Sequence, residues 1–110
     1  RPMIDGVDEI DRNEDGPLGP MPERDQALQY VGDEVYKMLE SGVIDLDFTP
    51  RSLREDLERL TKFAIYVWMR TEWARTYPDR IPVIMMGGES LEVAFAPKPD
   101  DLQVGPIDEY

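Results

Sequence analysis

The pattern of apolar and polar positions predicts a first helix over residues 23–40. Its apolar side chains recur three or four positions apart, so they share one helix face. Pro22 suits a first turn, and Gly42 supplies a stop signal, because glycine readily adopts the left-handed conformation that ends many helices. Gly32 lies inside this span and costs roughly 1 kcal/mol relative to alanine. The apolar face consists of Ala27, Leu28, Val31, Val35, Met38 and Leu39.

A second, longer helix is predicted from Pro50 to Tyr77, because no internal proline or glycine interrupts these 28 residues. At 1.5 Å rise per residue such a helix would be roughly 42 Å long. Thr49 offers a cap, and Ser52 with Glu55 offers a competing capping box. The pattern indicates a core-facing helix, with a short coiled-coil seam as the alternative. Its apolar stripe is Leu53, Leu57, Leu60, Ala64, Val67, Thr71 and Ala74.

Three short segments have the alternation or the β-branched content of strands: residues 43–48, 81–86 and 91–96. Gly87 and Gly88 between the last two permit the positive φ angles of a tight hairpin turn. The predicted fold class is therefore α+β, with two helices packed on a small antiparallel sheet that ends in a C-terminal β-hairpin.

The two ends of the chain are rich in proline and acidic residues, which indicates extended or disordered arms flanking the domain. We expect an acidic arm over residues 1–22, a compact domain over 23–96 and a Pro-rich tail over 97–110. The expected core consists of Leu28, Val31, Val35, Leu39, Leu46, Phe48, Leu57, Leu60, Ala64, Val67, Trp68, Val83 and Phe95.

The net charge of −12 and the pI near 4.2 limit the classes of partner. Residues 49–80 have a net charge of +2, and every other part of the chain is negative. Nucleic acids and anionic membranes are bound mainly through lysine and arginine, so direct binding to either is disfavoured. A basic protein surface is a compatible partner. The longest apolar run, residues 63–69, is too short to cross a bilayer, and we expect the protein in the cytoplasm or inside a macromolecular assembly.

The chain contains no cysteine and no histidine, which excludes disulfides, thiolate or imidazole zinc sites and His-dependent catalysis. The string that begins at Asp11 and runs to Asp15 matches the opening of a calcium loop, but Pro22 stands where the bidentate glutamate belongs. An acidic turn is the preferred interpretation, with calcium binding as the alternative. We therefore predict no catalytic residue, no metal site and no cofactor.

A second stripe on the long helix gathers aromatic side chains that a small domain would have difficulty covering, and the alternative is that the hairpin covers this face within one chain. Arg51 and Arg54 have few acids nearby and could receive an acidic arm of this chain or of a copy. We expect the contacts with a partner protein or a homo-oligomer to include Phe63, Tyr66, Arg70, Trp73, Tyr77, Arg51, Arg54, Ile107 and Tyr110.

These features favour a non-enzymatic protein–protein interaction or assembly subunit, such as a virion, connector or accessory subunit, that docks onto a larger complex. The alternative is an acidic mimic of nucleic acid that inhibits a DNA-binding protein or enzyme. Against mimicry, much of the negative charge lies in the predicted arms, whereas mimicry requires carboxylates held at fixed spacing.

Overall fold

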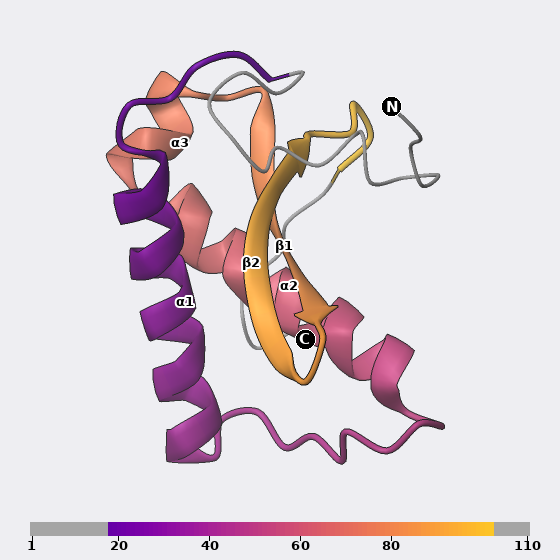
Figure 1. The fold of residues 1–110 in the computed structure, drawn as a ribbon. Helices are drawn as coiled ribbons and strands as arrows, with labels where there is room; N and C mark the ends of the chain where they lie inside the picture. The colour runs from indigo at the N-terminus through magenta and orange to yellow at the C-terminus, as the bar shows by residue number, and fades with distance from the viewer. Residues whose placement is uncertain (1–17, 103–110) are drawn as a thin grey trace.

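The computed structural model describes residues 18–102 of the chain and has an α+β fold. Figure 1 shows the two strands as a hairpin that lies across α2, with α1 beside the hairpin and α3 at one end of the molecule. The elements in chain order are α1 (Arg24–Ser41), α2 (Leu53–Met69), α3 (Glu72–Thr76), β1 (Arg80–Gly87) and β2 (Ser90–Pro97).

The first helix and its stop signal confirm the prediction from the sequence. Gly42 follows α1 with φ of 80° and donates its backbone N–H to the Leu39 carbonyl at 3.3 Å. The helix packs inward through Ala27, Val31 and Val35. Ahead of it, Met21 is fully buried although it falls within the predicted arm.

The prediction of one helix of 28 residues is wrong at its start, since α2 has 17 residues and begins at Leu53. The hydroxyls of Thr49 and Ser52 lie 2.9 Å apart, and the Ser52 N–H donates to the Thr49 carbonyl at 3.0 Å. These contacts close a turn immediately before the helix. Ser52 makes no side-chain cap to the helix backbone: its hydroxyl oxygen accepts the Thr49 N–H and its proton is donated to Asp56.

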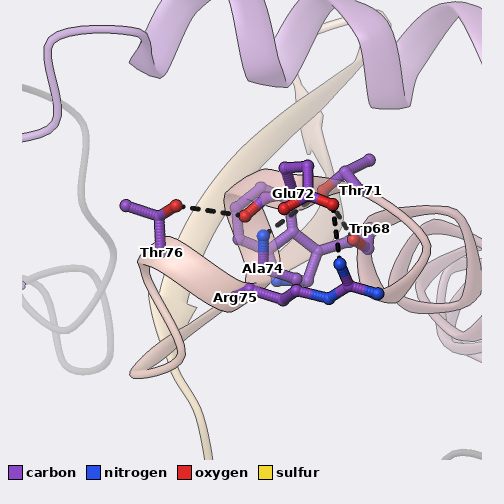
Figure 2. A network of polar contacts seen from close by, with 6 residues as sticks. All are labelled: Trp68, Thr71, Glu72, Ala74, Arg75 and Thr76. Atoms are coloured by element: carbon purple, nitrogen blue, oxygen red, sulfur yellow. Dashed lines mark hydrogen bonds and ion pairs between the residues drawn. The ribbon is translucent and has the colours of Figure 1, made fainter.

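The other end of the predicted long helix is broken by Thr71, which has an extended backbone with φ of −97° and ψ of 159°. Its hydroxyl donates to the Trp68 carbonyl at 2.7 Å and accepts the Ala74 N–H at 3.3 Å, so it closes α2 and caps α3 (Figure 2). Threonine is a favourable N-cap residue, so Thr71 can start a new helix. The predicted long helix is therefore interrupted although it contains no glycine or proline. An ion pair between Arg75 and Glu72 at 2.6 Å links the first and last turns of α3.

The predicted strand at residues 43–48 is also wrong, because the segment is irregular and the sheet has two strands. Ile44 is buried and Asp45 is exposed, so burial alternates here as in a strand. The segment nevertheless does not pair with an edge of the sheet. The N–H of Ile84 in β1 donates to Thr61 of α2 at 2.9 Å, which occupies that part of the β1 edge. Phe48 adopts a φ of 53°, outside the strand region, and is 41% exposed rather than part of the core.

The hairpin confirms the prediction for residues 81–96 and extends it by one residue at each outer end. Antiparallel pairing runs from Arg80 opposite Pro97 to Gly87 opposite Ser90. Two residues therefore form the turn, and Gly88 has a φ of 74°. A positive φ at the first turn residue alone is the pattern of a type II′ turn, which suits twisted strands.

The core lies where α1, α2 and the hairpin meet. Trp68 packs on Phe95 with ring centroids 4.9 Å apart and donates its indole N–H to the Arg80 carbonyl at 3.1 Å. The expected core residues that are buried are Val31, Val35, Leu60, Ala64, Val67, Trp68 and Phe95. Half-buried are Leu28, Leu39, Leu46, Leu57 and Val83. The core also includes apolar residues that were not expected there: Met21, Ala27, Ile44, Phe63, Ala74 and Ile84.

Candidate protein-docking surface

The aromatic side chains predicted as a partner stripe make contacts within the chain. Phe63 is 3% exposed and belongs to the core. Trp73 is half-buried and meets Tyr30 of α1 edge to face, with centroids 6.1 Å apart. The break at Thr71 places Phe63 and Trp73 on different helices, so these residues do not form one continuous surface.

The remaining members of the predicted stripe also have partners. Arg70 lies over the ring of Tyr66, 5.5 Å from its centroid, and donates to its hydroxyl at 3.4 Å. Tyr77 donates its hydroxyl to Glu23 at 3.0 Å, and this hydrogen bond to a carboxylate raises the pKa of Tyr77. The structure thus joins α3 to the start of α1 through side chains that were expected to face a partner.

An open groove of about 740 Å³ lies between α2 and β1. Its lining residues include the aliphatic side chains of Leu53, Leu57, Ile65, Ile81, Ile84 and Leu102. Polar lining residues come from α2: Arg54, Glu58, Thr61 and Lys62. The groove is therefore a mainly apolar surface with charged groups along one helix.

The geometry of α2 explains the groove. Leu60 and Ala64 face the core, whereas Leu53, Leu57 and Ile65 follow four-residue steps on the neighbouring face. Thr61 continues these steps and accepts the Ile84 N–H, which fixes β1 against the helix. Ile81 and Ile84 of β1 then complete the opposite wall.

Four of the twelve basic residues of the chain lie at or beside this groove, next to the exposed acids Glu55 and Glu58. Arg54 lines it, and Arg51 is exposed three residues earlier. Arg59 donates to the Asp45 carbonyl at 3.3 Å, so this arginine also contacts the preceding connection. Of the two acids in the first turn of α2, Glu55 is exposed, whereas Asp56 is buried and accepts two internal hydrogen bonds. The acidic charge that could offset these arginines is thereby partly withdrawn from the surface.

The groove contains one of the predicted site residues, Arg54, and most of its walls were not predicted. Ile107 and Tyr110 lie outside the described residues, as does the calcium-like string Asp11–Asp15. The four-residue steps through Leu53, Leu57 and Ile65 were present in the sequence, but Leu53 and Leu57 were assigned to the core-facing stripe.

Within residues 18–102, no group of three acidic side chains has an arrangement that could hold a metal ion. In the same part of the chain, no helix has the length and apolar character needed to cross a membrane. The chain matches no protein family model, no curated protein and no solved structure.

Proposed function

We propose that this protein is a non-enzymatic interaction subunit that docks into a larger assembly through the groove between α2 and β1. The observation that carries the proposal is the open apolar groove with Arg54 and Lys62 among its lining residues. The lining leucines Leu53, Leu57 and Leu102 are half-buried. A partly exposed apolar surface of this kind is typical of protein-binding sites, because covering it removes apolar area from water.

The chemistry of the groove favours an extended acidic segment of a neighbouring subunit that carries aliphatic side chains. Aliphatic groups of the segment would pack on Leu53, Leu57 and Ile65, while its carboxylates would face Arg54 and Arg51. Such charge complementarity contributes to specificity and to the rate of association. The groove is also open along α2, which suits an extended chain better than a small molecule.

A peptide of this chain's own residues 99–110 provides a suitable probe, since it combines four acids with Leu102, Val104, Ile107 and Tyr110. We expect the fluorescein-labelled peptide to bind the full chain saturably in an anisotropy titration. Arg54→Glu should weaken binding about tenfold, the equivalent of roughly 1.4 kcal/mol, because it turns an attraction into a repulsion.

Arg75→Glu is the matched control, because it makes the same charge change on α3, outside the groove. Leu53→Ser should also weaken binding, since it removes an apolar contact without changing the charge. If Arg54→Glu and Arg75→Glu weaken binding equally, the peptide responds only to overall charge and the groove is not the docking site.

A further inference from the structure

A second apolar cleft, of about 170 Å³, lies between α1 and the hairpin. Gly32, Tyr36 and Leu39 of α1 form one wall, and Leu91 and Val93 of β2 form the other. It is separate from the groove on α2, although Ile84 lines both. Its lining includes no charged side chain, so it is suited to an apolar group.

The mouth of this cleft is unusually apolar for a solvent-facing surface. Tyr36 is 60% exposed, Leu91 is 38% exposed and Met86 is 37% exposed. Met86 pairs with Leu91 across the hairpin, next to the pair of Ile84 and Val93, so the apolar strip continues from the cleft toward the turn. Tyrosine with neighbouring aliphatic side chains is a common composition for a protein interface.

The surroundings of the cleft are acidic, in contrast to the groove on α2. Residues 30–42 and 84–93, which contain its walls, hold five acids and one lysine, a net charge of −4. The lysine, Lys37, is 3.0 Å from Glu34, and this hydrogen bond raises the pKa of Lys37. Asp33 and Glu40 lie next to cleft-lining positions of α1, and Glu89 lies in the hairpin turn. Glu92 stands between the cleft-lining Leu91 and Val93, so its side chain is on the opposite face of the hairpin.

Gly32 controls how deep the cleft is. A β-carbon added there would meet the Val93 side chain at 3.5 Å, an ordinary van der Waals distance. Alanine therefore fits, whereas a longer side chain would extend into the space between α1 and β2. Alanine would therefore restore helix stability without filling the cleft, whereas a longer side chain would fill it.

We infer that the cleft between α1 and the hairpin is a docking site for a basic segment of a partner protein, which inserts one aliphatic or aromatic side chain beside Tyr36. The apolar lining of the cleft indicates that the partner segment inserts an apolar side chain. The acidic residues around the cleft indicate that the rest of the segment is positively charged. The site is of opposite charge to the groove on α2, and the inference holds whether or not that groove binds a segment.

The test uses the full chain and two fluorescein-labelled peptides, GKRKLLKRKG and the same peptide with a central Ser-Ser pair. We expect the Leu-Leu peptide to bind at least tenfold more tightly in 150 mM salt. Gly32→Met should weaken it about tenfold by filling the cleft, while Gly32→Ala should bind like the unchanged chain and be slightly more stable. Tyr36→Ala should also weaken binding, with circular dichroism confirming that each variant is folded.

Equal binding of the two peptides would overturn the inference, because carboxylates alone would then account for the attraction, as in a mimic of nucleic acid. Unchanged binding by Gly32→Met would overturn it as well, since the anchor would not enter the cleft. Absence of saturable binding by either peptide up to 1 mM would exclude the site for this chemistry. Arg54→Glu should leave binding of the basic peptide intact, which separates this site from the groove on α2.

Discussion

Tyr77 connects the end of α3 to the start of α1, and its hydroxyl is the group that makes the connection. The hydroxyl donates to Glu23 at 3.0 Å, and this hydrogen bond to a carboxylate is the main reason that the pKa of Tyr77 is raised. Nearby Arg80 acts in the opposite direction, because a positive charge favours the phenolate. The effect of the Glu23 carboxylate is larger than that of Arg80, so the pKa of Tyr77 is raised and the neutral phenol is favoured in the folded chain.

This raised pKa predicts a loss of stability in alkali. The contribution of the Tyr77 hydrogen bond is fully present below the unfolded pKa of about 10 and is lost as the pH rises through the higher folded pKa. Tyr77→Phe should therefore be less stable than the unchanged chain near pH 8, and the difference should shrink above about pH 11. Urea unfolding at both pH values measures it. Tyr36→Phe, at an exposed position, is the control, and a difference that stays constant with pH would contradict the prediction.

At the scale of elements, the sequence predicted those whose signals are local. Helix α1 ends at Gly42 and the hairpin turns at Gly88, and both glycines have the positive φ that the prediction required. The break between α2 and α3 was missed because a threonine hydroxyl makes it, and Thr71 also fits a continuous helix. The strand at 43–48 was wrongly predicted because its alternation cannot report whether a neighbouring strand edge is available to pair with it.

The candidate groove could be predicted only in part, because its walls come from two elements that are distant in the sequence. Arg54 and Arg51 were found because residues 49–80 are the positive part of the sequence. The apolar walls come from α2 and β1 together, and the register between a helix and a distant strand is not encoded in the periodicity of either. Ile65, Ile81 and Ile84 therefore became part of a site only in the folded chain.

The irregular connection from α1 to α2 is held by the buried carboxylate of Asp56. Its Oδ2 accepts the Phe48 N–H at 2.8 Å and the Ser52 hydroxyl at 2.9 Å. These two bonds hold Phe48, just before Thr49, and Ser52, just after the turn. Phe48, which makes the first of these bonds, has a positive φ. A carboxylate in the first turn of α2 is also favourable beside the positive helix end.

Removing this carboxylate should destabilise the fold. We expect Asp56→Ala to lower the free energy of unfolding by about 2–3 kcal/mol, because two partly buried donors lose a charged acceptor. Asp56→Asn should cost less, since its amide oxygen can still accept. Urea denaturation measures both. Asp47→Asn, an exposed acid in the same connection, should stay within about 0.5 kcal/mol, and an equal loss in Asp47→Asn would show that Asp56 acts through overall charge alone.

At the scale of the whole molecule, Arg80 joins more parts of the chain than any of the arginines on α2. It is 2% exposed at the start of β1, and its Nη2 donates to the Leu18 carbonyl at 2.7 Å. Its guanidinium also lies 5.0 Å from the ring centroid of Tyr77 and 5.7 Å from that of Phe95. One cation therefore connects the segment before α1, the end of α3 and the hairpin.

Arg80→Met tests this role, because methionine preserves much of the apolar stem and removes the cation. We expect a loss of about 1.5–3 kcal/mol, the usual contribution of a hydrogen bond to a charged group. The loss should be accompanied by faster cleavage after Glu23 by a glutamate-specific protease, since residues 18–23 lose their bond to β1. Exposed Arg75→Met should change neither stability nor cleavage noticeably. Because apolar replacements of buried charges are sometimes neutral, an Arg80→Met chain as stable as the original would show that the stem, rather than the cation, holds these segments together.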